Sequence, residues 1–277
     1  MKQIARIFFG LILLVGFGII AEGQNSSPPP AGDETDFIVP ARPTFSNPAE
    51  FQKPGVLQLE LGYNANFHGT GLKAEHDNPL ALRFAVSSRI LLEFDSDNVI
   101  SQHPDPGMTA TGLGDMQLGI QTVLEHEHGS RPGIAFAYYI KLPTADCSKG
   151  LGTGRVDHDF IAFISKKVHE TTIDFNAIYL LAGRTTRSGH ASSGQAAIAA
   201  SRNVSKRFGL QGEISGFSRN DAQPGATFGL GVVTFQVNRR LVFDAGVRSG
   251  LTHGAPHVGA VAGLTVGISD LYKGRKK

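Results

Sequence analysis

The sequence predicts an all-β protein: a closed antiparallel transmembrane β-barrel of about 12 strands that follows a cleaved signal peptide. Apolar and polar residues alternate in a series of short runs, the connections between these runs alternate in length, and the apolar positions carry almost no charge. A soluble β-sandwich also shows alternating residues, but it has no reason to sort short and long connections to opposite ends. We therefore expect a membrane barrel.

The beginning of the chain has the features of a secretory signal peptide, which we assign to residues 1–23. Lys2 and Arg6 precede an uninterrupted apolar stretch over residues 7–20, and small residues precede the expected cleavage before Gln24. This stretch is short for a spanning helix, although an uncleaved anchor is the alternative. Since no later apolar run has the length of a spanning helix, a mature chain in a membrane would cross it as strands.

The rest of the chain divides into two segments. Residues 24–55 are rich in Pro, Ser, Asp and Gly and show no period, which predicts a flexible periplasmic lead-in. Residues 56–277 contain the alternating runs and form the predicted barrel.

The predicted strands follow one another without long interruptions. They cover residues 56–67, 79–86, 90–95, 113–125, 133–142, 157–166, 172–182, 194–202, 207–216, 226–237, 240–249 and 257–269. The tight or polar turns are 87–89, 126–132, 167–171, 203–206 and 238–239, and the mostly longer loops are 68–78, 96–112, 143–156, 183–193, 217–225 and 250–256. This alternation predicts a barrel with its long loops outside the cell and both chain ends in the periplasm.

The two faces of each predicted strand differ in charge. The uncharged face, which includes Leu118, Phe243 and the series Phe228, Leu230 and Val232, is expected to contact lipid, where a Lys or Arg at mid-depth costs about 2 to 4 kcal/mol. The opposite face is expected to line the lumen, and its charged residues are Glu60, Arg83, Glu93, Asp115, Lys141, Asp174, Glu213, Asp244 and Arg248. Their mixed signs predict no strong preference for one sign of ion.

One long loop is a candidate gate. Residues 143–156 contain Gly150, Gly152 and Gly154, which would give flexibility, and lie between Lys141 and Asp157. We expect this loop to narrow the outer mouth of the barrel, with a plain surface loop as the alternative.

Composition and motifs exclude several other functions. The formal net charge is +2, and no basic stripe interleaved with aromatic residues is present, which argues against nucleic acid. The single cysteine, Cys147, has no partner for an internal disulfide. The run Glu125–His128 is too local to close a metal site, so neither a metal nor a cofactor is expected. The expected partners are outer-membrane lipid, a small-molecule solute and the barrel assembly machinery.

An enzymatic barrel is the least favoured interpretation. Asp157, His158 and Asp159 together with Ser165 would supply the side chains of a hydrolytic site. In a strand, however, His158 points away from both aspartates, so an Asp-His pair within the strand is disfavoured.

An ordered series of short motifs adds a resemblance to a known family. The series consists of Arg42-Pro43, Gly55–Tyr63, Gly112–Asp115, Leu142–Thr144, Leu151–Gly154, and Asp157 with Asp159. It resembles the outer-membrane family named for the MetA pathway of phenol degradation, over nearly all of the chain from about Arg42. The sequence departs from that pattern in having Ala145 where a glycine is typical, and in lacking a terminal aromatic residue.

The resemblance implies an outer-membrane β-barrel that transports aromatic or other poorly soluble compounds. Together with the strand pattern it predicts a channel for passive uptake of small, aromatic or hydrophobic solutes in the bacterial outer membrane, and no enzyme. The alternatives are a structural or adhesive barrel without transport and, less favoured, a lipid-modifying enzyme.

Overall fold

The computed structural model of the chain describes residues 37–184, 188–219 and 224–272. The predicted signal peptide and the first part of the predicted lead-in, residues 24–36, lie outside the described residues, as do the last five residues of the chain. No helix among the described residues is long and apolar enough to cross a membrane.

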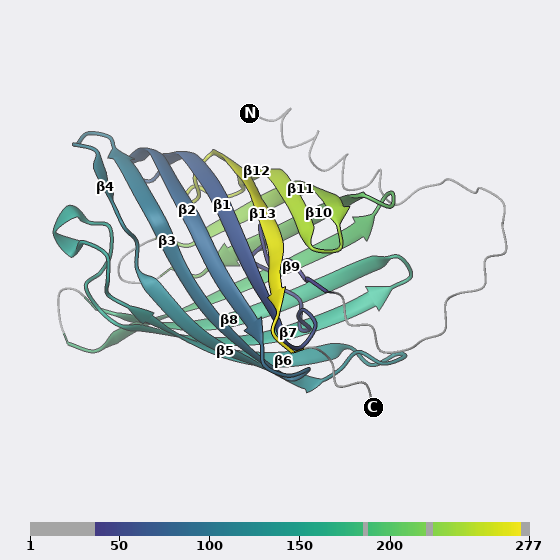
Figure 1. The fold of residues 1–277 in the computed structure, drawn as a ribbon. Coiled ribbons are helices and arrows are strands. Elements are labelled where there is room, and N and C mark those ends of the chain that lie inside the picture. Colours follow the sequence, from purple (N-terminus) through teal and green to yellow (C-terminus); the bar gives the residue numbers. More distant parts are fainter. Residues whose placement is uncertain (1–36, 185–187, 220–223, 273–277) are drawn as a thin grey trace. The chain divides into compact units, whose positions relative to one another are not determined.

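The described chain forms one antiparallel sheet that closes into a barrel (Figure 1). The strands are β1 (Val56–Gly69), β2 (Leu72–Ala85), β3 (Ile90–Pro104), β4 (Ala110–Gly112), β5 (Met116–Glu125), β6 (Gly133–Leu142), β7 (Asp157–Val168), β8 (Thr171–Gly183), β9 (His190–Asn203), β10 (Phe208–Phe217), β11 (Ala226–Asn238), β12 (Leu241–Gly250) and β13 (Val258–Asp270). β1 pairs with both β2 and β13, and the pairing of β2 with β3 completes the ring. The three-residue β4 pairs with β3 alone, so the barrel wall consists of twelve strands, as the sequence predicted.

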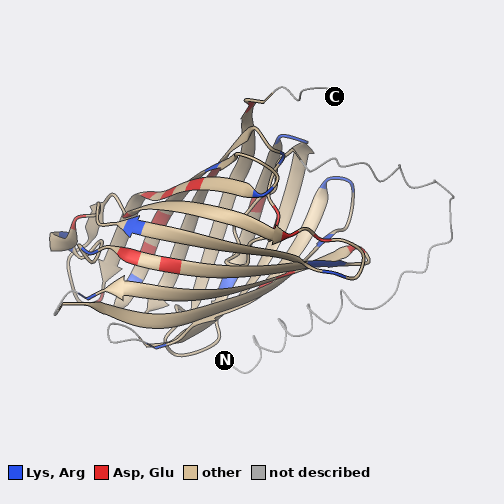
Figure 2. Cartoon of the chain, turned by 90° about the horizontal axis from the view of Figure 1, so that it is seen from below, with Lys and Arg blue, Asp and Glu red and all other residues tan. Residues whose placement is uncertain are grey.

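The barrel has the inside-out polarity of a membrane protein. On the outer surface the side chains of Leu118 and Phe243 are 47% and 42% exposed, whereas inside the barrel Glu60 and Arg83 are 3% and 1% exposed. Figure 2 shows Asp and Glu along the strands and many of the Lys and Arg residues near strand ends. An apolar exterior around a polar interior suits a barrel in lipid, because charge is then confined to the inner face.

The predicted orientation of β11 is wrong. Phe228, Leu230 and Val232 are buried inside the barrel, and the exposed apolar residues of this strand are Val233 and Val237. Leu230 pairs with the interior residue Glu213 of β10, which fixes its direction. Neither face of this segment carries a charge, so alternation alone did not distinguish the inner face from the outer face.

The first three strands extend further than the sequence predicted, toward the end of the barrel that carries loop 143–156. Residues 68–78 are largely strand rather than loop, because β1 and β2 continue to a connection of two residues, Thr70–Gly71. Much of the predicted loop 96–112 likewise belongs to β3. Both faces of these extensions carry polar residues, which removes the alternation but permits strand beyond the apolar belt.

The two ends of the barrel differ in their connections. One end, which we call the short-turn end, has the connections 86–89, 126–132, 169–170, 204–207 and 239–240. The other end, which we call the long-loop end, carries the connections 143–156 and 251–257. The chain enters and leaves the barrel at the short-turn end, where the Leu271 N–H donates to the Gly55 carbonyl oxygen at 2.7 Å.

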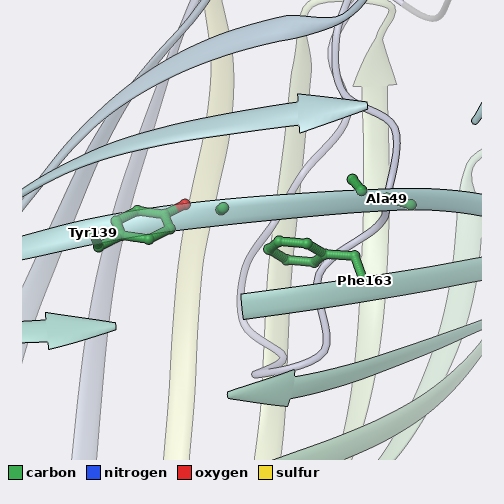
Figure 3. Close-up of a cluster of buried hydrophobic side chains, with 5 residues drawn as sticks. Ala49, Tyr139 and Phe163 are labelled. Atoms are coloured by element: carbon green, nitrogen blue, oxygen red, sulfur yellow. The ribbon is translucent and has the colours of Figure 1, made fainter. Parts of the chain in front are cut away.

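Residues 37–55, which we call the inner segment, are not a free lead-in. They run inside the barrel, where Ala49, Phe51 and Ser46 are buried. Figure 3 shows Ala49 beside Phe163 of β7, with Tyr139 further along the wall. The prediction of a flexible lead-in is therefore wrong for this stretch. The physical reason is that interior side chains of the strands satisfy its backbone polar groups, so irregular backbone is stable inside the barrel.

Candidate functional site

Glu60 and Arg83 hold the first part of the inner segment. The Glu60 carboxylate accepts hydrogen bonds from the backbone N–H groups of Ala41 and Arg42, at 2.9 and 3.0 Å. The Arg83 guanidinium donates to a backbone carbonyl of the inner segment at 2.8 Å, and lies 3.4 Å from Glu60 and 3.1 Å from Glu93. Since these groups are buried, one guanidinium and two N–H groups compensate two carboxylates.

Arg42 provides the second attachment, through its side chain. Its guanidinium donates to both oxygens of Asp244, at 3.0 and 3.2 Å, and to the Ala262 carbonyl at 2.8 Å. Gly62 and Gly263 face each other across β1 and β13, and a Cβ atom on them would lie 1.8 and 2.4 Å from atoms of this guanidinium. Because the two glycines have no side chains, they leave space on the inner wall for the Arg42 guanidinium, and a larger residue would fill that space. We call this space the glycine seat.

Ser46 and Ala49 form the third attachment, on the opposite part of the wall. The Ser46 N–H donates to Glu213 and its hydroxyl donates to the Asp174 carbonyl oxygen, both at 2.7 Å. The Ala49 N–H donates to the Ser165 hydroxyl at 2.7 Å, and that hydroxyl donates to the Asp174 carboxylate at 2.5 Å. The inner segment is therefore tied to β7, β8 and β10 as well as to β1, β2 and β12.

Two cavities adjoin the inner segment, with volumes of about 460 and 450 Å³. The first is lined by Arg42 to Phe45, Asn47 and strands β1, β2, β3 and β12, and the second extends toward β5, β6 and β7. They share Arg42, Phe45, Asn47, Glu60, Pro79, Ala81, Glu93 and Asp97. A lumen of this size accommodates a small organic molecule.

The charges around these cavities are mixed but mainly acidic. The first cavity has Arg42 and Arg248 facing Glu60, Glu75, Asp77, Glu93 and Asp97. The second has Arg42 and Lys141 facing Glu60, Glu93, Asp95, Asp97, Asp115 and Asp159. The acidic groups lie mostly on β2, β3 and their neighbours, so acidic side chains outnumber basic ones along this part of the inner wall, which we call the acidic wall.

Arg248 differs from the other interior basic residues. Its guanidinium carbon lies over the rings of Phe45 and Phe228, at 5.1 and 6.0 Å from their centroids. Arg42, Arg83 and Lys141 each form an ion pair, whereas the Arg248 guanidinium has neither an ion pair nor a hydrogen bond among the described residues. Its N–H donors are therefore available at the cavity.

Lys141 connects the long-loop end to the barrel. Its ammonium group lies 2.8 Å from Asp115 and 2.7 Å from Asp157, and it donates to the Thr153 hydroxyl at 3.2 Å. Asp157 also accepts from the Gly183 N–H at 2.8 Å. One cation thus joins β6, β7 and loop 143–156.

Loop 143–156 is packed rather than loose. Gly150 and Gly154 have φ values of 75° and 64°, which glycine adopts readily, and a Cβ on Gly152 would lie 2.8 Å from the Cβ of Ala145. Leu151 is buried and lies against Gly112. The loop includes the short helix η1 (Cys147–Lys149), where hydrogen bonds from Ser148 hold the pKa of Asp146 below its ordinary value. Two of the three glycines therefore serve the turns, and the third serves close packing.

The residues predicted to line the lumen fall into three groups in the structure. Glu60, Arg83, Glu93 and Asp244 surround the first part of the inner segment, Asp174 and Glu213 hold its second part, and Asp115, Lys141 and Arg248 line the cavities. Sequence reasoning missed Arg42, Phe45, Asp77, Asp97 and Tyr139. Asp77 and Asp97 fell in predicted loops, and Arg42 and Phe45 in the predicted lead-in, so no strand pattern was available to find them.

The residues of the disfavoured hydrolytic site are not assembled. The Nδ1 atom of His158 lies 2.8 Å from the Tyr138 hydroxyl, whereas Asp159 lines a cavity and Ser165 binds the inner segment. The run Glu125–His128 also has structural contacts, among them Glu127 with Lys166 at 2.8 Å. In the part of the chain that the structure describes, no group of three or more His, Cys, Asp or Glu residues is arranged to hold a metal ion.

Comparison with solved structures identifies barrels of the same fold. An outer membrane channel from Pseudomonas putida F1 superposes with a TM-score of 0.62 at 13% sequence identity, over 79% of this chain and 97% of that one. The NanC porin superposes with a TM-score of 0.53 at 8% identity, over 77% and 99% of the two chains. No curated protein matches the chain. The shared fold and the apolar outer surface are those of a bacterial outer-membrane barrel.

The sequence itself identifies the family. The family described as "Putative MetA-pathway of phenol degradation" matches residues 41–266, from the inner segment to the last strand of the barrel. The matched residues include Arg42, its ion-pair partner Asp244 and the whole of loop 143–156. The chain belongs to the MetA-pathway phenol degradation family of outer-membrane β-barrels.

Proposed function

We propose that the protein is an outer-membrane channel for passive uptake of small solutes, including aromatic or hydrophobic ones, and that it is not an enzyme. The observation that carries this proposal is the pair of cavities of about 460 and 450 Å³ inside a closed barrel. They are lined by charged residues that a soluble core would not tolerate in such number. Family membership supports the proposal, since phenol degradation requires entry of an aromatic solute.

In this proposal the inner segment and loop 143–156 control the passage of the solute through the barrel. The inner segment narrows the lumen, held there by Glu60, Asp244 and Glu213, and loop 143–156 narrows the mouth, held there by Lys141. The outer belt that includes Leu118 and Phe243 would contact outer-membrane lipid. Insertion of the barrel would require the barrel assembly machinery of the cell.

Planar-bilayer recording and liposome swelling with the refolded mature protein test this function. We expect discrete current steps in salt, and swelling in small neutral sugars that slows as solute size increases. The matched control is the Leu118→Gln variant, which changes only the lipid-facing surface and should conduct as the parent does. A folded barrel that gives neither current nor swelling would contradict the channel.

A structural barrel without transport is the second candidate, and one observation favours it. The inner segment is hydrogen-bonded to eight strands, β1, β2, β5, β7, β8, β10, β12 and β13, and most of these bonds are buried or partly buried, as expected for a permanent plug. The same recordings decide between the two, because a permanent plug predicts no current in the parent and current after its attachments are removed.

A further inference from the structure

We infer that the first cavity is a binding site for a zwitterionic solute that carries a carboxylate and an ammonium group, bound by Arg248 and by the acidic wall of β2 and β3, respectively. This inference rests on the proposed channel function and names the class of solute. It begins from the one interior guanidinium that the described residues leave without an ion pair or hydrogen bond.

The surroundings of Arg248 favour a carboxylate. The rings of Phe45 and Phe228 lie against its guanidinium carbon, and cation–π contacts of this kind stabilise the charge without using the N–H donors. Those donors are arranged as a planar fork that matches the two oxygens of a carboxylate. Because Arg248 lines the cavity, a solute oxyanion has access to them.

The facing wall favours a cation. Asp77 accepts a single hydrogen bond, from Asn64 at 2.7 Å, and the Asp97 carboxylate has no hydrogen-bond donor or basic partner among the described residues. Both line the same cavity as Arg248, and β2 is separated from β12 by β13 and β1. The two charges are thus on different parts of the wall with the cavity between them, rather than neutralising each other in an ion pair.

The separation of charges selects against simple ions. An anion would be attracted by Arg248 but repelled by Asp77 and Asp97. A cation would be attracted by these two carboxylates but repelled by Arg248. A zwitterion satisfies both parts of the wall without a net charge. The half-exposed ring of Phe45 adds an apolar surface beside Arg248, which suits a solute with an aromatic or aliphatic body.

Equilibrium binding to the detergent-solubilised full barrel tests the inference independently of transport. The probes are phenylalanine, 3-phenylpropionate and 2-phenylethylamine, which present both charges, the carboxylate alone and the ammonium alone on the same ring. Isothermal titration calorimetry should show phenylalanine binding about tenfold or more tightly than either other probe, since one charge-assisted interaction is lost in each.

The variants assign the two charges. Arg248→Gln should weaken phenylalanine binding about tenfold or more and leave 2-phenylethylamine unchanged or tighter, whereas Asp77→Asn with Asp97→Asn should weaken the amine and phenylalanine. Arg240→Gln is the matched control, because Arg240 also lies over a ring of the inner segment, Phe37 at 4.2 Å, but does not line either cavity.

Three results would overturn the inference: equal affinity for the three probes, no binding of phenylalanine, or phenylalanine binding unchanged by Arg248→Gln. Binding of phenylalanine to a barrel that passes no current would instead reject the channel and retain the site.

Discussion

Arg42 and Asp244 are 202 residues apart in the sequence and form a two-point hydrogen-bonded ion pair inside the barrel. The Asp244 carboxylate lies beside Gly263 on the neighbouring strand, so the ion pair sits over the glycine seat described above. Their side chains are 9% and 3% exposed, which places the ion pair out of bulk water. This contact joins the inner segment to the last part of the barrel.

Removing one partner of this ion pair should destabilise the barrel strongly. Arg42→Ala leaves Asp244 buried without its counter-charge, and such a change costs about 3 to 5 kcal/mol. The double variant Arg42→Ala with Asp244→Ala should lose less than the two single losses combined, because no buried charge remains. Urea unfolding followed by the heat-modifiable band on gels measures both. Additive losses would show that the two side chains do not interact.

The glycine seat offers a test that leaves every charge in place. Gly62→Ala should displace the Arg42 guanidinium, because the new Cβ would occupy its position, and the inner segment should become more accessible to protease in detergent. Gly212→Ala is the control, since no atom lies within 4 Å of a Cβ added there. Equal protection of both variants would mean that Arg42 is not required to hold the segment.

Adjacent residues on β5 test which face contacts lipid. Leu118→Arg should reduce the fraction of folded, heat-modifiable barrel, because an arginine facing mid-bilayer costs about 2 to 4 kcal/mol. Gln117→Arg should fold, since Gln117 lines a cavity and lies 2.7 Å from the acidic side chain of Asp159. Similar folding yields for the two variants would reject this assignment of faces.

The number of strands and the charged interior were predictable from the sequence. When apolar and polar residues alternate along a strand and only one face carries charge, the uncharged face is the one that contacts lipid. The face of β11 was not, since Leu230 and Val233 are both apolar and only the partners on β10 and β12 distinguish them. The inner segment was also beyond prediction. Ser46 and Ala49 have no pattern of their own, and their positions depend on Glu213 and Ser165, more than a hundred residues away.

The native Cys147 reports which end of the barrel faces outward. It is the chain's single cysteine and is exposed in loop 143–156, at the long-loop end. A membrane-impermeant maleimide should label it on intact cells. In a Cys147→Ser background, Asn238→Cys at the short-turn end should react after lysis only. If Asn238→Cys instead reacted on intact cells and Cys147 reacted only after lysis, the barrel would have the opposite orientation in the membrane.

Loop 143–156 is expected to restrict the mouth through Lys141, whose ammonium group joins Asp115, Asp157 and Thr153. Lys141→Met keeps the length of the side chain but removes the ammonium contacts with Asp115, Asp157 and Thr153, while the Ala145 N–H of the loop still donates to Asp115. Single-channel current of the folded barrels should then rise. The fraction of folded barrel should fall, because the Asp115 and Asp157 side chains, which are 11% and 10% exposed, lose their counter-charge. Deletion of residues 148–153 should raise the current further, since it also removes Leu151 from its buried contact with Gly112. The control is Lys149→Met, in the same loop but exposed and paired with Asp146 alone. If all three variants conduct as the parent does, the loop is no gate, and the inner segment is then the element that sets the conductance.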